Sequence, residues 1–249
     1  MQKTALITGA ARGIGLATAE IFQANGYRVA ILDRDAQALS AAAAQLPQAE
    51  PMLFDLALPE TAAEVARQIE EKFGALAALV NNAGVADFGP IEDCDRAMWR
   101  KVMDTNLDGM FHLTQALTPQ LKAGTGSVVN IASISGLRAS TLRVAYGTSK
   151  AAVMQLSKQQ AVELGEYGIR VNCVAPGPVR TKLAMAVHTQ DIIDAYHDAI
   201  PLNRYGHEIE IAEVIYFLCS QKASFVTGQV IAVDGGFEAT GVGLPALRR

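Results

Sequence analysis

Short apolar runs alternate with amphipathic stretches along almost the whole chain. Runs of four to eight apolar and β-branched residues are typical of buried strands, whereas apolar residues three or four positions apart are typical of helices. The predicted strands are residues 4–8, 27–32, 51–54, 76–80, 127–132, 169–175 and 229–233. The predicted helices cover residues 16–25, 36–46, 59–73, 98–122, 151–164 and 208–220, with weak amphipathic character around 190–199. This alternation indicates an α/β fold.

No linker, repeat or low-complexity block divides the chain. Its 249 residues suffice for one large α/β domain or two small ones, and we predict a single domain over 1–249. Within it, residues 180–206 have a mixed character that predicts a mobile flap, and 237–249 form a tail. The tail either reaches the pocket of a neighbouring subunit or frays.

Composition and charge narrow the class of protein. Half of the residues are hydrophobic and 18% are charged, which suits a compact soluble protein. The net charge is −4 and there is no long basic run, so we predict neither a nucleic acid nor a membrane as partner. The N-terminus enters a folded element at once, so we predict neither a secretory signal nor a membrane span.

Cysteine and histidine usage predicts a reduced protein without a catalytic metal. The three cysteines are far apart and none has metal-ligand spacing, so we interpret them as reduced thiols in a cytoplasmic protein. The four histidines also show no ligand pattern.

The first strand leads into a glycine-rich turn that opens a helix. Gly9, Gly13 and Gly15 are spaced G-x-x-x-G-x-G. Glycines let the backbone approach a pyrophosphate, and a helix N-terminus supplies free N–H groups, so this turn favours a dinucleotide site over a plain tight loop.

An acidic residue ends the second strand. Asp33 lies eighteen residues after Gly15, where a dinucleotide fold places an acid against the adenosine ribose hydroxyls. Its charge would repel a 2′-phosphate, so NAD(H) is predicted ahead of NADP(H). Arg12 or Arg34 could instead receive that phosphate.

Three further segments have two interpretations each. Asp55 either contacts an adenine amino group or caps the helix at 59–73. Asn81-Asn82-Ala83-Gly84 either borders a cofactor crevice or forms an ordinary turn. Asn106 lies inside the predicted helix 98–122, although an amide is a poor helix former.

Tyr146 and Lys150 lie four residues apart in the first turns of a predicted helix. They therefore share a face, and the ammonium is expected to lower the pKa of the phenol, which is normally about 10. Such a tyrosine can serve as a general acid or base. Taken alone, the pair is also common on solvated helices, so its meaning depends on the other motifs.

In order, these motifs resemble the short-chain dehydrogenase/reductase family over about residues 4–236. The matching residues are Thr8-Gly9-x-x-x-Gly13-x-Gly15, Asn81-Asn82-Ala83-Gly84, Asn106, Ser133, Tyr146-x-x-x-Lys150 and Pro176-Gly177. Ser133 precedes Tyr146 by thirteen positions. Ile200-Pro201-Leu202-x-Arg204, Val226-Thr227-Gly228-Gln229 and Val233-Asp234-Gly235-Gly236 resemble the oxoacyl-carrier-protein-reductase-like branch.

The resemblance implies a single Rossmann-type, doubly wound, seven-stranded parallel sheet with helices on both faces, assembled into a homotetramer. It also implies a catalytic tetrad of Asn106, Ser133, Tyr146 and Lys150, in which Asn106 holds a water that links Lys150 to solvent. The implied cofactor contacts are Gly9, Arg12, Gly13, Ile14, Gly15, Asp33, Asp55, Leu56, Asn82, Ala83, Gly84, Tyr146, Lys150, Pro176, Gly177, Val179 and Thr181.

The predicted activity is NAD(H)-dependent interconversion of a secondary alcohol and a ketone, with Tyr146 as general acid and base. The alternatives are a catalytically silent nucleotide-binding regulator and an NADP(H)-dependent 3-oxoacyl reductase. Epimerases and dehydratases of the family are usually longer, and an enoyl reductase would need a wider Tyr-to-Lys interval.

Substrate contacts are predicted at Ser135, Arg138 and Arg143, with Arg180, Lys182 and His188 in the flap. An arginine fork matches a carboxylate, sulfonate or phosphate, so the substrate is predicted to be polar, anionic or sugar-like. Alternatively, these arginines are solvated or lie at a subunit interface.

Overall fold

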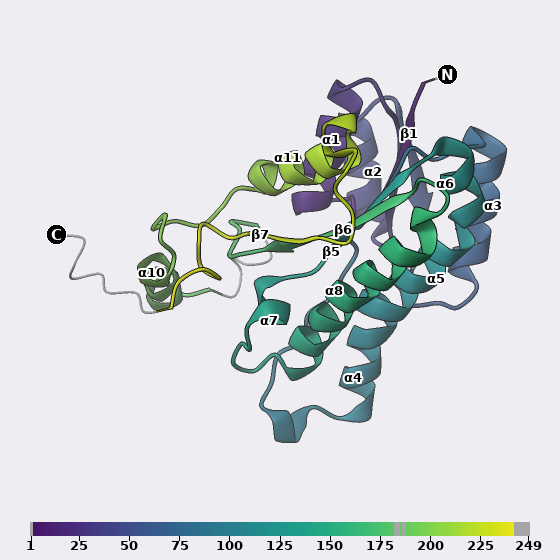
Figure 1. The fold of residues 1–249 in the computed structure, drawn as a ribbon. Helices are drawn as coiled ribbons and strands as arrows, with labels where there is room; N and C mark the ends of the chain where they lie inside the picture. The colour runs from purple at the N-terminus through teal and green to yellow at the C-terminus, as the bar shows by residue number, and fades with distance from the viewer. Residues whose placement is uncertain (1, 182–184, 186–187, 242–249) are drawn as a thin grey trace.

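Helices and strands alternate along the chain in the computed structural model, which describes residues 2–181, 185 and 188–241 (Figure 1). The strands are β1 (Thr4–Thr8), β2 (Arg28–Asp33), β3 (Ala49–Leu53), β4 (Ala78–Asn81), β5 (Ser127–Ile131), β6 (Arg170–Pro176) and β7 (Val230–Val233). The α-helices are α1 (Gly13–Ala24), α2 (Ala36–Gln45), α3 (Thr61–Phe73), α4 (Arg96–Met103), α5 (Gly109–Ala116), α6 (Thr118–Gly124), α7 (Ile134–Leu137), α8 (Val144–Gly165), α10 (Gln190–Ala199) and α11 (Glu208–Cys219). Shorter turns are the 3₁₀ helices η1 (Ile91–Asp93) and η3 (Gln221–Ala223) and the π-helical η2 (Asp104–Asp108).

The seven strands form one parallel sheet in the order β3-β2-β1-β4-β5-β6-β7. The predicted doubly wound, seven-stranded parallel sheet is confirmed. From β1 the chain winds outward to β3, and from β4 it winds outward in the other direction to β7. The strand order therefore reverses between β1 and β4, and the crevice at their carboxyl ends is where such sheets bind ligands.

The strands bury side chains on both faces because helices cover both (Figure 1). Ile7 and Val80 belong to the core under α1, α2 and α11, whereas Leu6 and Leu79 belong to the core under α3, α5, α6 and α8. Continuous apolar strands are what a doubly covered sheet requires.

The prediction of one helix over 98–122 is wrong. The chain there forms α4, the π-helical turn η2, α5 and α6, and Pro119 lies in the first turn of α6. A π-helical turn is a short irregularity inside an otherwise helical stretch, and the overall apolar pattern of that stretch still indicates a helix, so the turn was not predicted. The third strand also begins at Ala49 rather than Pro51, and its edge position tolerates the proline.

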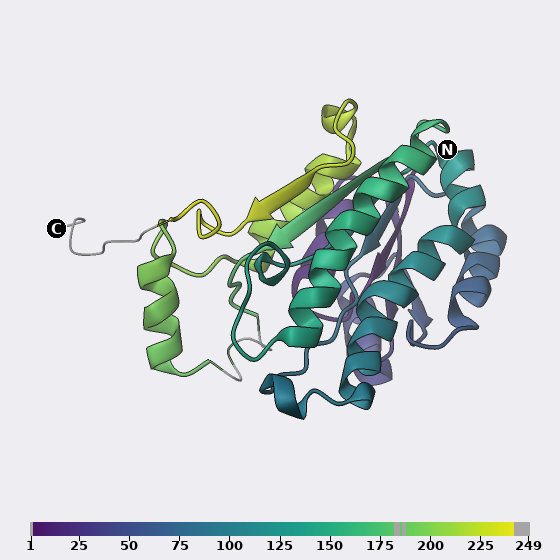
Figure 2. The same ribbon diagram turned by 60° about the horizontal axis from the view of Figure 1, so that its bottom comes forward.

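The predicted flap contains α10, which lies beside the described end of the chain, away from the main body (Figure 2). Ile193, Ile200 and Tyr205 form a small apolar cluster against which Phe237 packs. The start of the tail is thus held on its own chain. Parts of the predicted flap, 182–184 and 186–187, and residues 242–249 of the tail lie outside the described residues. Among the helices that the structure describes, none combines the length and apolar character needed to cross a membrane.

Candidate active site

The glycine-rich turn between β1 and α1 is packed too tightly for side chains. A Cβ on Gly15 would lie 2.2 Å from the Gly9 carbonyl oxygen, and a Cβ on Gly9, whose φ is +62°, would lie 2.8 Å from the Ala83 Cα. A Cβ on Gly13 would make only an ordinary contact with the Thr181 Cγ2 at 3.8 Å, but the φ of +58° at this position favours glycine. The turn is therefore a backbone cradle at a helix N-terminus, which fits the pyrophosphate of a dinucleotide.

Asn82 ties this cradle to the end of β4. Its amide Nδ2 donates to the carbonyl oxygens of Thr8 at 2.9 Å and Gly9 at 3.1 Å. The Thr8 hydroxyl accepts the N–H groups of Asn82 and Ala83 and donates to the Val80 carbonyl. Thr8 is absent from our predicted site residues, although it stands in the motif, and its role is to hold the cradle in place.

The acid after β2 is fixed by backbone donors. The Asp33 carboxylate accepts the N–H of Ala11 at one oxygen and that of Asp35 at the other, both at 3.1 Å. These two bonds orient the carboxylate beside the glycine-rich turn, where the sequence predicted a contact with the ribose.

The two arginines near Asp33 have carboxylate partners. Arg12 pairs with Asp35, and the Arg34 Nη1 lies 3.3 Å from the Asp55 Oδ2. The alternative of Asp55 as a helix cap is wrong, since α3 is preceded by Glu60 and has no side-chain cap. Leu56, predicted as a cofactor contact, packs its side chain in the core.

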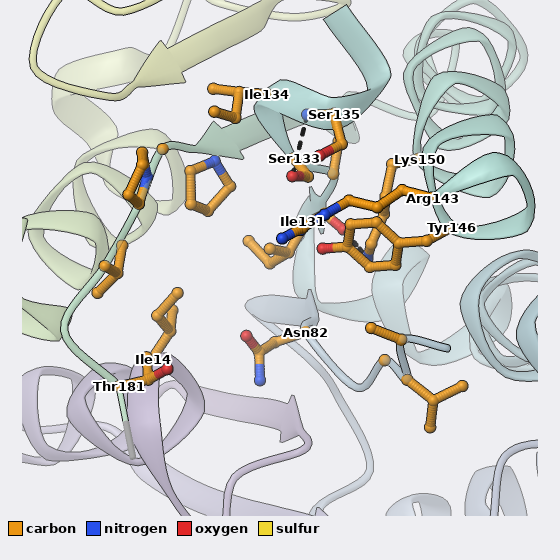
Figure 3. Close-up of a pocket in the computed structure, with 18 of the residues that line it drawn as sticks. Ile14, Asn82, Ile131, Ser133, Ile134, Ser135, Arg143, Tyr146, Lys150 and Thr181 are labelled. Carbon is orange, nitrogen blue, oxygen red and sulfur yellow. Dashed lines mark hydrogen bonds between the residues drawn. The ribbon is translucent and has the colours of Figure 1, made fainter. Parts of the chain in front are cut away.

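A cavity of about 280 Å³ opens near the carboxyl ends of the central strands (Figure 3). It brings together predicted site residues from every part of the chain, namely Ile14, Asn82, Gly84, Ser133, Ser135, Arg143, Tyr146, Lys150, Pro176, Gly177, Val179, Thr181 and His188. Sequence reasoning missed other lining residues, among them Val85, Ala86, Phe88 and Tyr196. Val85, Ala86 and Phe88 lie within four residues after the predicted Asn81–Gly84 segment, so the chain just beyond that segment was the available signal.

Lys150 is buried on α8, one turn beyond Tyr146. Its ammonium donates to the Ile131 carbonyl oxygen at 2.8 Å and lies 5.8 Å from the centre of the Tyr146 ring. Burial lowers the pKa of Lys150 to about 8.

The predicted lowering of the pKa of Tyr146 by Lys150 is wrong in this structure. Burial raises this pKa, because a phenolate loses more hydration than a phenol does. A hydrogen bond with Ser133 and the charge of Arg143 act in the opposite direction. The cation that acts against burial is therefore Arg143.

Ser133 faces Tyr146 because α7 packs closely on α8. A Cβ on Gly136 would lie 2.6 Å from the carbonyl carbon of Lys150, so only glycine permits this approach. The Ser133 hydroxyl caps α7 by accepting the Ser135 N–H at 3.1 Å, which leaves its own hydrogen for the bond to Tyr146. The Ser135 hydroxyl bonds with that of Ser140 at 3.0 Å.

Asn106 lies behind the pocket rather than in its lining. The π-helical turn carries it into the interior, where it is fully buried. Its amide donates to the Val85 carbonyl at 2.9 Å and the Ser149 hydroxyl at 3.0 Å, and its oxygen accepts the Val85 N–H at 2.8 Å. A Cβ on Gly84 would lie 3.3 Å from the Asn106 Oδ1 and 3.4 Å from the Lys150 Nζ. Asn106 thus fixes the loop that borders Lys150.

Comparison with known proteins agrees with this site. The family model described as enoyl-(acyl carrier protein) reductase matches residues 9–238. The chain is 38% identical over 238 residues to galactitol 2-dehydrogenase (L-tagatose-forming) of Cereibacter sphaeroides, covering 94% of each chain. It is 35% identical to the 3-oxoacyl-acyl-carrier-protein reductase of Staphylococcus epidermidis, covering 95% of this chain and 99% of the relative.

The chain belongs to the short-chain dehydrogenase/reductase family. Among solved structures, it superposes with a TM-score of 0.91 on a gluconate 5-dehydrogenase from Burkholderia cenocepacia in complex with NADP and tartrate, at 32% identity. That match covers 96% of this chain and 97% of the other. The predicted family is confirmed, and the protein is an oxidoreductase of the alcohol dehydrogenase and carbonyl reductase type that uses a nicotinamide cofactor.

On the substrate side of this short-chain dehydrogenase/reductase, the two arginines predicted to contact the substrate, Arg138 and Arg143, lie in different places. Arg143 lines the pocket, and its guanidinium lies 4.6 Å from the centre of the Phe88 ring. The prediction that Arg138 contacts the substrate is wrong in this structure, because Arg138 lies outside the pocket lining and pairs with Glu238 at 2.7 Å. Arg138 is therefore engaged with the start of the tail.

The described part of the flap contributes His188 and Tyr196 to the pocket. The His188 Nδ1 lies 2.9 Å from the Tyr205 hydroxyl, and the ring stacks on Tyr196 with centroids 5.6 Å apart. Burial, and to a lesser extent Arg143, lower the pKa of His188. Arg180 is exposed, and Lys182 lies outside the described residues.

Proposed function

We propose that the protein is an NAD(H)-dependent dehydrogenase of small polar secondary alcohols that also reduces the corresponding ketones, with Tyr146 as general acid and base. The observation that supports it is that Tyr146, Ser133 and Lys150 line one pocket with Ile14 of the glycine-rich turn. This arrangement supports the proposal that Tyr146 is a proton donor next to a cradle suited to a dinucleotide.

Two side chains would act on the substrate oxygen, Ser133 by hydrogen bonding and Tyr146 by hydrogen bonding and proton transfer. The Ser133 and Tyr146 hydroxyls would hydrogen-bond this oxygen and stabilise the charge that develops on it. In ketone reduction Tyr146 gives its proton to the oxygen, and in alcohol oxidation it takes that proton back. When bound, the nicotinamide supplies or accepts the hydride.

Other residues hold the cofactor or position the catalytic groups. The backbone at Gly9–Gly15 would face the pyrophosphate, Asp33 the adenosine ribose and Asp55 the adenine. Lys150 would bind the nicotinamide ribose, with Val179 and Thr181 near the carboxamide. Asn106 keeps the Val85 segment in place, and its further role in a water link from Lys150 to solvent stays a prediction.

The preference for NAD(H) rests on the charges around Asp33. A 2′-phosphate would meet this carboxylate, while Arg12 and Arg34 are already paired with Asp35 and Asp55. Recruiting either arginine would leave a carboxylate unpaired, so NADP(H) is disfavoured. The gluconate 5-dehydrogenase in complex with NADP makes the side-by-side measurement with both cofactors essential.

The proposal includes a homotetramer in the cytoplasm. In the family resemblance, the helical region 98–122 and the helix at 146–165 pair across a two-fold axis. Apolar side chains on these helices, such as Phe111 and Val162, are exposed in the single chain. Three cysteines without disulfide partners suit a reducing compartment.

A second candidate function is 3-oxoacyl reduction with NADPH, favoured by the similarity to the Staphylococcus epidermidis enzyme. A 3-oxoacyl thioester supplied with NADPH tests it in the same assay. Faster turnover of this thioester than of small polar ketones with NADH would replace our proposal.

The decisive experiment compares the wild type with Tyr146→Phe. Consumption of NADH and NADPH is followed with a panel of small polar ketones. Removing the phenol hydroxyl should lower kcat by about 10²- to 10⁴-fold, the usual contribution of a general acid. The dissociation constant for NADH, measured by fluorescence titration, should change far less than kcat, because the ring that faces the cofactor is kept.

The matched control is Tyr167→Phe, because Tyr167 is exposed just beyond the end of α8 and away from the pocket. It should retain wild-type kcat. Unchanged turnover in Tyr146→Phe would contradict the assignment, and a wild type that binds NADH but reduces nothing would favour the silent regulator.

A further inference from the structure

Arg143 presents a positive charge to the reaction centre. It immediately precedes α8, one turn before Tyr146, and Figure 3 shows its side chain running into the pocket on the side of the Tyr146 phenol. Its charge acts on both Tyr146 and His188, so the guanidinium lies within electrostatic reach of the two side chains. The face of Phe88 supports it from one side.

No carboxylate among the described residues pairs with Arg143. The described pocket lining contains no Asp or Glu, and the sequence has none at the positions outside the described ranges. Arg138, only five residues earlier, does have an acidic partner in Glu238. A half-buried guanidinium without a counter-ion is poised for an anionic ligand.

We propose that Arg143 forms a carboxylate subsite, so that the substrate is a hydroxy acid or keto acid whose carboxylate pairs with this guanidinium while its oxygen meets Ser133 and Tyr146. This inference rests on the proposed function and narrows it from polar alcohols in general to hydroxy acids. The His188 ring, held by Tyr205 and stacked on Tyr196, offers a second polar group beside the same anion.

The geometry favours a carboxylate over a phosphate. A planar guanidinium binds a carboxylate through two parallel hydrogen bonds, and one cation balances one negative charge. Among the described lining residues the other cation is Lys150, which donates to the Ile131 carbonyl, so a dianion would lack a second positively charged partner there.

The position of Arg143 also limits the length of the substrate. Arg143 is the N-cap residue of α8, only three residues before Tyr146, and lines the same pocket, so the carboxylate and the reacting carbon would be separated by a short chain of about one to three carbons. Suitable probes are 3-oxobutanoate, 4-oxopentanoate and 5-oxohexanoate, each compared with its methyl ester, which removes the charge and keeps the ketone.

The experiment measures the ratio of kcat/KM for each acid to that for its ester, with NADH, in the wild type and in Arg143→Ala. The ratio is the informative quantity, because any effect of Arg143 on the pKa of Tyr146 applies to both compounds and cancels. At least one acid should be preferred by the wild type, and Arg143→Ala should lower that ratio about 10- to 100-fold, the usual value of a hydrogen bond to a charged group. Arg143→Lys should restore it in part.

Arg138→Ala is the matched control, and it should leave the ratio at the wild-type value because Arg138 is bound to Glu238 outside the pocket. The same acids and esters are also titrated calorimetrically into the enzyme with NAD⁺, so the subsite is tested without turnover. Equal losses for acid and ester in Arg143→Ala, or no acid bound more tightly than its ester, would overturn the subsite and leave the dehydrogenase assignment standing. Failure of every acid and ester to react would count against the proposed function, while calorimetry would still decide the subsite.

Discussion

At the scale of single residues, Tyr146 is governed by a competition between burial and charge. Burial raises the pKa of the phenol, and Ser133 and Arg143 reduce this increase. A raised pKa keeps Tyr146 protonated near neutral pH, which is the form required to donate a proton in ketone reduction. Alcohol oxidation requires the opposite form, so it should become faster as the pH rises through the pKa of Tyr146.

Removing the charge of Arg143 should shift this pH dependence. The guanidinium favours the phenolate, so Arg143→Gln should raise the pKa of Tyr146 and move the rise of kcat/KM for oxidation of the neutral alcohol 2-butanol to higher pH by about one unit. Arg138→Gln, the matched control, should follow the wild-type profile. A shift of the Arg143→Gln profile to lower pH would contradict the electrostatic role given to this side chain.

Individual residues also show where sequence information ends. Ser133, Tyr146 and Lys150 share the pocket as predicted, because their spacing along one strand end and one helix decides their position. Arg138 and Arg143 look equivalent in the sequence, and only folding brings Glu238, one hundred residues away, to Arg138. The pKa of Tyr146 was wrongly predicted because its burial depends on segments distant in the chain.

At the scale of helices and strands, the predictions succeed where a pattern repeats and fail where one residue changes the geometry. The seven strands were found because each contains a short apolar run, although the third begins two residues earlier than predicted. The π-helical turn η2 was not predicted. The only sign of it in the sequence was Asn106, a poor helix former inside an apparent helix. This turn buries Asn106 against Val85 and Ser149, so the local irregularity fixes the loop at Val85 that borders Lys150.

A buried amide network joins the sheet to the helices that carry the site. The Asn130 amide on β5 donates to Ser157 and Gln160 on α8, each at 2.9 Å, and its oxygen accepts from Asn81 on β4 at 2.8 Å. Asn81 in turn donates to Thr114 on α5 at 2.9 Å. The network therefore fixes α8 relative to the sheet.

Asn130→Ala should lower the free energy of unfolding by about 3 kcal/mol, because it leaves several buried polar groups without partners at about 1–3 kcal/mol each. Urea unfolding at one fixed protein concentration measures this loss. Asn25→Ala, at the exposed end of α1, is the control and should cost well under about 1 kcal/mol. Equal losses in the two variants would show that the network contributes little.

At the scale of the whole molecule, the outer surface of α8 exposes the apolar side chain of Val162 to solvent. Its inner face is buried through Ala145, Val153 and Ala161, yet Val162 on the opposite side is 77% exposed. Phe111 on α5 is 40% exposed. Surface helices normally present polar residues to water, so these apolar side chains are compatible with the proposed subunit contact without establishing it. Neither the sequence nor one folded chain supplies the partner, because its contacts come from another molecule.

If copies of the chain pair through α8, Val162→Glu should break the assembly. In an interface related by a two-fold axis, each substitution is repeated in the partner, so two carboxylates would be buried close together without counter-ions. Light scattering after size exclusion should give about four times the 26.4 kDa chain mass for the wild type and about half of that or less for the variant. Leu53→Glu, which adds the same charge at an exposed position on the edge strand β3, should remain a tetramer. A Val162→Glu protein with the wild-type mass would place any subunit contact elsewhere, and a monomeric wild type would remove the need for a covered face.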